Sequence, residues 1–172
     1  FIEGADLNTD DWAFFYTCCA RTCHIRGQRP YLNQAFFEQL GKDMPEHMTL
    51  QIAQHANGER LAAALFFKDD QTLYGRYWGA LADVDCLHFE VCYYQGIAYA
   101  LAHKLRYFDP GTQGEHKLSR GFSPVYTQSL HWLHDERFMQ AVLHYVEREQ
   151  LGILDYYEEA RAALPFKKLH PI

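Results

Sequence analysis

The spacing of apolar residues changes period along the chain. From Trp12 onward they recur at three- and four-residue steps, which predicts a helix over residues 9–27 with Thr9 as its cap. Residues 33–41 predict a second, shorter helix, which Gly41 would end.

The period then shortens to two. Residues 49–55 alternate, Asn57-Gly58 is a strong hairpin signal, and residues 61–67 are an almost continuous apolar run. A run of that kind is typical of a strand covered on both faces. With residues 72–78 as a third strand, the pattern predicts an antiparallel three-strand meander.

A long helical pattern follows at residues 87–105, and residues 106–109 then predict a short strand. A strand, a helix and another strand in this order imply a crossover connection and a parallel strand pair. The residues expected on the buried face of the helix are Phe89, Tyr93, Ile97, Ala100 and Leu101.

The C-terminal third is more polar. Residues 114–121 predict a charged loop, and residues 122–130 predict a last strand. A helix is expected from Asp135 to Gln150, and a separate one over residues 153–164, because Gly152 would break the pattern. We find no repeat and no low-complexity linker, so residues 1–172 are interpreted as a single domain.

Composition supports one well-buried domain: 48% of the 172 residues are hydrophobic and 16% are aromatic. The formal net charge of −6 argues against general nucleic-acid binding, since phosphate neutralisation supplies most of that affinity. The sequence contains no apolar run near the ~20 residues of a membrane span, and we expect a cytoplasmic protein.

Five cysteines are an odd number and do not suggest a disulfide framework. We interpret them as small core residues. Zinc binding is the alternative, with one ligand cluster at Cys19, Cys23 and His24 and another at Cys86, His88 and Cys92. The sequence favours no metal site.

The charged loop contains the most suggestive chemistry. Glu115 or His116 is a candidate general base, since each can hold a proton-accepting form near neutral pH. Lys117 and Arg120 are candidates for binding a carboxylate or phosphate, and Gln113 completes this substrate-binding group. The alternative interpretation is an ordinary solvated loop.

The predicted crossover helix also presents polar groups. One face would carry candidate substrate-binding residues at three- and four-residue spacing, with Glu90 and Tyr94 on another sector. Glu90 is a second candidate base, and Tyr94 a further substrate-binding candidate. A buried hydrogen-bonded network explains the pattern equally well. Cys92 as a nucleophile is less favoured, since a thiolate needs a positive partner. The first face contains Cys92 and three substrate-binding candidates, which are His88, Gln95 and Tyr99.

Arg76 lies between aromatic residues on the third predicted strand. Strict alternation would place Tyr74, Arg76 and Trp78 on one face and Tyr77 on the other. Arg76 is therefore a candidate for substrate binding, although a structural cation–π contact is the preferred interpretation.

Several motifs together resemble one bacterial family, FemAB-like proteins of peptidoglycan biosynthesis or recognition within the acetyltransferase-like (GNAT) superfamily. The resemblance covers roughly residues 1–165 and is most specific over residues 75–124. The motifs occupy residues 75–79, 88–97, 108–111, 113–117 and 119–124. Family members have about twice this length, with two lobes in tandem, so this chain would be the C-terminal lobe.

The resemblance implies an α+β, GNAT-like fold with a mixed, mostly antiparallel sheet flanked by helices. It also implies transfer of an acyl or aminoacyl group to an amine, with Lys117 and Arg120 where relatives carry a basic residue. Acyl-CoA or aminoacyl-tRNA would be the donor, and no tightly bound cofactor is expected. One departure is that residues 80–86 contain Asp83 and Asp85 where acetyltransferases place a glycine-rich pyrophosphate loop.

Three functions remain open at this stage. The first is a transferase acting on a small molecule or peptidoglycan precursor, with one cleft surrounded by Glu90, Glu115, His116, Lys117 and Arg120. The second is a non-catalytic lobe that recognises such a precursor or a protein partner. The third, a metal-dependent hydrolase that would use His88, Glu90, Cys92 and His116, is least favoured. In each case an N-terminal lobe is expected to pack against this chain.

Overall fold

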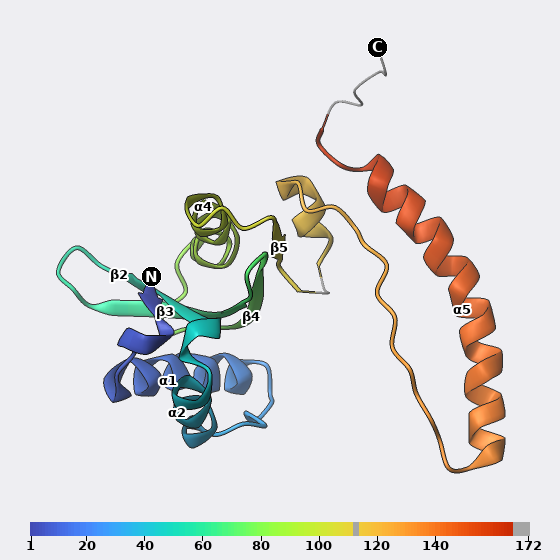
Figure 1. Ribbon diagram of the computed structural model, residues 1–172, viewed down its shortest axis with the longest axis horizontal. Coiled ribbons are helices and arrows are strands. Elements are labelled where there is room, and N and C mark those ends of the chain that lie inside the picture. The colour runs from blue at the N-terminus through green and yellow to red at the C-terminus, as the bar shows by residue number, and fades with distance from the viewer. Residues whose placement is uncertain (112–113, 167–172) are drawn as a thin grey trace. The chain divides into compact units, whose positions relative to one another are not determined.

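The computed structural model describes residues 1–111 and 114–166 (Figure 1). Contacts divide the chain into two compact units, Phe1–Thr112 and Gln113–Ile172. The first unit contains a sheet and the helices that cover it, and the second contains a short 3₁₀ helix and one long α-helix. The single domain and the two-lobe arrangement expected from the sequence stay predictions.

The sheet of the first unit has five strands in sequential order. The first four strands are antiparallel to their neighbours, which confirms the meander and its hairpin. The last two strands are parallel, as the crossover connection requires. The mixed α+β character is therefore confirmed. The strands are β1 (Ile2–Glu3), β2 (Met48–Gln54), β3 (Arg60–Lys68), β4 (Thr72–Ala80) and β5 (Tyr107–Asp109).

Helices cover both faces of this sheet. In Figure 1, α1 (Thr9–Ile25) and α2 (Gln34–Asp43) lie on one face, and α4 (Gln95–Ala102) lies on the other. Two 3₁₀ turns, η1 (Gly4–Asp6) and η2 (Pro45–His47), precede α1 and β2 respectively.

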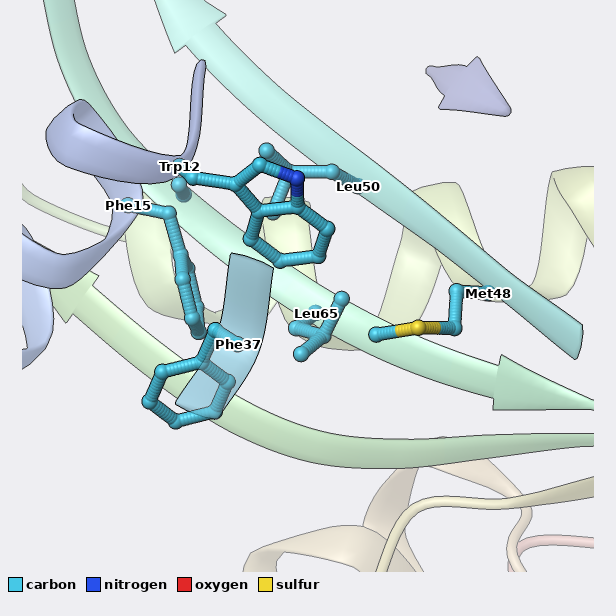
Figure 2. Packing of buried hydrophobic residues seen from close by; sticks show 7 residues of the cluster. Trp12, Phe15, Phe37, Met48, Leu50 and Leu65 are labelled. Carbon is cyan, nitrogen blue, oxygen red and sulfur yellow. The ribbon is translucent and has the colours of Figure 1, made fainter. Parts of the chain in front are cut away.

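β3 is the strand on which both layers pack. Ala63 and Leu65 belong to a cluster with α1, α2 and β2 (Figure 2), whereas Ala64 and Phe66 belong to a second cluster with the crossover helix. Alternate side chains of a strand point to opposite faces, so an unbroken apolar run serves both layers. The first cluster consists of Trp12, Phe15, Phe37, Met48, Leu50, Ala63 and Leu65.

The cap of α1 is one residue earlier than predicted. The side chain of Asn8, not that of Thr9, accepts the backbone N–H groups of Asp10 and Asp11. Asp11 is buried, accepts the Asn8 N–H in return, and forms an ion pair of 2.8 Å with Arg60 at the start of β3. The capping box thus also joins helix to sheet.

Two glycines allow close packing against α1. Gly41 does not end α2, which continues to Asp43. Its missing side chain instead leaves room for the Trp12 ring of α1. At Gly79 a Cβ would overlap the backbone of Cys18, so α1 lies directly on β4 there. Glycine is required at such sites for space rather than for its backbone freedom.

The crossover helix is not regular. It consists of α3 (Leu87–Phe89), a π-helical segment η3 (Glu90–Tyr94) and α4. A π turn contains one more residue than an α turn and so rotates the later side chains. The predicted buried face therefore fails at Leu101, which is 74% exposed, whereas Tyr99 is buried.

The second unit differs most from the sequence predictions. Residues 122–130 form no strand, since a strand needs a pairing partner and the described part of this unit offers none. One helix, α5 (Glu136–Ala162), runs through Gly152 without a break. The extended segment instead places Tyr126 on Tyr157 of α5, with ring centroids 4.2 Å apart. No helix in the described ranges has the length and apolar character to cross a bilayer.

The contact at Gly79 predicts a strong effect of one methyl group. Gly79→Ala forces the β4 backbone away from α1 and is expected to lower the free energy of unfolding by at least about 2 kcal/mol. Gly152→Ala, where a Cβ meets open space, should raise it by up to about 1 kcal/mol. Urea unfolding measures both, and equal effects would contradict the packing described.

Candidate functional site

A bulge in β4 shapes the most promising pocket. Gly75 pairs with Phe66 and Tyr77 pairs with Leu65, so Arg76 is an extra residue without an opposite partner on β3. Bulges re-aim side chains and are over-represented next to active sites. The Arg76 guanidinium lies over the Tyr77 ring, 4.9 Å from its centroid.

This bulge corrects the prediction that Tyr74, Arg76 and Trp78 share a face. Directly paired residues point to the same side of a sheet. Tyr74 pairs with Phe67, which packs with the α1 cluster, but Trp78 pairs with Ala64 of the opposite cluster. Strict alternation fails because the extra residue reverses the faces on either side of it.

The outer edge of β4 becomes open at the same place. β5 pairs only with residues 72–74 of β4, and Pro110 follows β5 directly. Proline has no N–H to continue a ladder. Beyond Tyr74, no strand among the described residues pairs with this edge of β4.

A pocket of about 140 Å³ lies between this edge and the crossover helix. His88 is half-buried in its wall, with its ring 5.2 Å from that of Trp78 and 5.4 Å from that of Tyr93, both edge-on. Among the functional candidates from the sequence, the pocket brings together Arg76, His88 and Cys92. Trp78, Tyr93 and Pro110 are lining residues that the sequence did not identify.

Other candidates on the crossover helix lie elsewhere. Glu90 is exposed and accepts a hydrogen bond of 2.7 Å from Gln95, and Tyr94 is 48% exposed. None of the three lines the pocket at His88. Glu90 and Tyr94 are the first and last residues of the π segment, and Gln95 begins α4. Their roles in substrate binding or catalysis stay predictions.

Tyr99 belongs to a different hollow, near the start of β4. Its hydroxyl donates to Glu3 at 2.8 Å and accepts from the Lys68 ammonium at 3.0 Å, and the His103 ring stacks on it. Burial alone would raise the pKa of the Glu3 carboxyl, but the hydrogen bonds from Lys68 and Tyr99 outweigh it and lower that pKa. This network ties β1 to β3 and α4, and a role of Tyr99 in substrate binding stays a prediction.

The charged loop forms a 3₁₀ helix, η4 (Glu115–Arg120), in the second unit. The carbonyl of His116 accepts from the Ser119 hydroxyl at 2.8 Å and from the Arg120 guanidinium at 2.7 Å. Gln113 lies outside the described residues. The other candidates in the loop belong to a unit separate from His88, so their meeting in one cleft stays a prediction.

His116 is suited to accept a proton. Burial lowers the pKa of His116 below its ordinary value, and the charges of Lys117 and Arg120 lower it further. A neutral imidazole is the form that a general base requires. Glu115 and His116 therefore stay candidate bases on the second unit.

Two neighbouring cysteines of α1 are held as unreactive thiols. Burial raises the pKa of Cys18 to about 11 and that of Cys19 to about 12, so both thiols are protonated at neutral pH. Cys86 is exposed and so is not a core residue. In residues 1–111 and 114–166, no three His, Cys, Asp or Glu side chains gather as metal ligands would.

Comparison with known proteins identifies the family. A model of FemAB-like proteins, described as peptidoglycan biosynthesis/recognition, matches residues 1–168. The chain belongs to the FemAB-like family. Family membership gives the protein a role related to the cell wall, as the sequence motifs predicted. A search of curated proteins finds none that matches the chain.

Burial and the neighbouring positive charges of His116 lead to a prediction about the pH at which its ring titrates. Its NMR titration midpoint should lie below 6.5, and Lys117→Gln should move the midpoint upward by removing a repelling charge. The folded chain favours the neutral imidazole of His116. The contribution of His116 to the stability of the fold should therefore be complete above the pKa of an ordinary histidine and decline as the pH falls through the lowered pKa. Lys42→Gln, an exposed change on α2, is the control. A midpoint above 6.5, or one unmoved by Lys117→Gln, would contradict this assignment.

Proposed function

We propose that this FemAB-like protein transfers an acyl or aminoacyl group from an ester or thioester to an amine of a cell-wall precursor. The observation that carries the proposal is the open edge of β4 at Arg76, facing a pocket that contains His88. Acyl-CoA and aminoacyl-tRNA are the two donor classes considered. The GNAT-like fold stays part of this proposal.

The reaction asks little of the protein beyond positioning and proton transfer. The amine nitrogen forms a bond to the donor carbonyl carbon, and the bond from that carbon to the thiol sulfur or sugar oxygen breaks. The proton lost by the amine passes through a base to the leaving group. Alignment of the two reactants and stabilisation of the oxyanion supply most of the rate.

Residues around the pocket fit these tasks. Backbone N–H groups along an unpaired strand edge can donate to a carbonyl oxygen as negative charge develops on it. His88 is held between the Trp78 and Tyr93 rings and is our candidate to accept the proton. Arg76, re-aimed by the bulge, is our candidate to bind a carboxylate or phosphate of the substrate.

The test is a transfer assay with labelled acetyl-CoA or aminoacyl-tRNA and amine-bearing peptidoglycan precursors. His88→Gln should lower kcat/KM by about 10²-fold or more, which is typical for loss of an acid–base group. His103→Ala, at an exposed histidine outside the pocket, should change kcat/KM less than about threefold. Circular dichroism confirms that both variants are folded.

Three outcomes decide the proposal. Transfer that depends on His88 supports it. Transfer that survives His88→Gln but is lost in His116→Gln assigns the base to η4 instead. No transfer from either donor, with precursor binding retained, favours a non-catalytic recognition lobe, a function that the modest pocket volume of about 140 Å³ also suits.

A further inference from the structure

A second, larger pocket adjoins the first. Its volume is about 430 Å³, and it lies between the C-terminal end of α1 and the segment that links β4 to the crossover helix. Trp78 and His88 line both pockets. A single extended ligand can therefore contact both by passing these two rings.

Two arginines, one in α1 and one directly after it, line this pocket. The Arg21 guanidinium donates to the carbonyl of Ala80 at 2.9 Å, which holds it against the end of β4. Arg26 follows the last helical residue, and no carboxylate among the described residues lies within ion-pair distance of its guanidinium. Arg26 is thus available to bind a ligand.

The rest of the lining is mostly apolar, and its polar members are Thr22, Asp83 and His88. Ile25 is 68% exposed and Val84 is 40% exposed, and Trp78 adds an aromatic surface. The lining contains two arginines and one aspartate, so the local net charge favours binding of an anion. The exposed aliphatic side chains favour a ligand whose anionic group is attached to an apolar part.

We propose that Arg21 and Arg26 form a binding site for the phosphate or diphosphate group of a small substrate. The inference rests on the proposed function, because it makes this pocket the holding site for a substrate whose reacting end reaches His88. Guanidinium groups match phosphate oxygens in a bidentate geometry. The segment that links β4 to the crossover helix contains two acids, Asp83 and Asp85, and so supplies negative charge. The positive charge of the pocket comes from Arg21 and Arg26 at the C-terminal end of α1.

Titration with inorganic pyrophosphate tests the site directly, without need of turnover. Binding to the chain is measured by calorimetry at low salt, where charge interactions are least screened. Arg26→Gln should weaken binding by about tenfold or more, the effect of one charge-assisted contact. Asp83→Asn should tighten binding, because it removes the opposing charge.

Arg29→Gln is the matched control, since Arg29 is an exposed arginine near Arg26 that does not line the pocket. It should change the affinity less than about twofold. Equal losses in the two arginine variants, or no pyrophosphate binding at millimolar concentration, would overturn the site. Tighter binding in Asp83→Asn together with a loss confined to Arg26→Gln supports it.

Competition then separates the two sources of a diphosphate. Displacement of pyrophosphate by coenzyme A assigns the site to the donor, and displacement by a nucleoside diphosphate assigns it to the acceptor. Binding that depends on Arg26 without any transfer activity leaves this site standing and contradicts only the proposed reaction. Transfer that depends on His88, with pyrophosphate binding unaffected by Arg26→Gln, contradicts only this site.

Discussion

The architecture depends on burying β3 from both sides. Ala63 and Leu65 pack under α1 and α2, and Ala64 and Phe66 pack under the crossover helix, so one strand anchors both helical layers. A two-sided strand offers no face to solvent, which explains why almost every residue along it is apolar. The layer of α1 lies close to the sheet, because Gly79 has no side chain to keep α1 away from the backbone of β4.

Local irregularities on this regular frame create the site. The bulge at Arg76 frees one side chain from the sheet pattern, and the short β5 leaves the edge of β4 open beyond Tyr74. The π segment of the crossover helix lies opposite that edge. Both departures cost regular hydrogen bonding, and proteins often retain them near functional sites. Their coincidence at one pocket is the structural basis of the proposed transfer.

Much of the first unit could be predicted from the sequence because its signals are local. The hairpin at Asn57-Gly58, the apolar run of β3 and the crossover follow from turn chemistry and periodicity. The bulge and the π segment could not, since each is a one-residue insertion whose cost is met by tertiary packing. Gly41 likewise depends on tertiary packing: it makes room for the Trp12 ring and does not end the helix, which the local sequence alone could not reveal.

The irregular backbone of the crossover helix also explains why the candidate residues on it do not all share one site. His88 of α3 and Cys92 of the π segment lie one turn apart and line one pocket, whereas Tyr99 lies beyond the π segment and joins Glu3 and Lys68 instead. The expected strand at 122–130 is absent because alternation alone does not supply a pairing partner. Local patterns predict which groups can share a face only while the backbone stays regular.

Hydrogen exchange measured with and without a non-reactive donor analogue tests the central claim most directly. If the donor binds against the open edge of β4, the amides of residues 75–78 should exchange more slowly in its presence, along with those near His88. Amides around the separate hollow at Tyr99 and His103 should be unchanged. Protection confined to that hollow, or absent from β4 although the analogue is bound, would contradict the account.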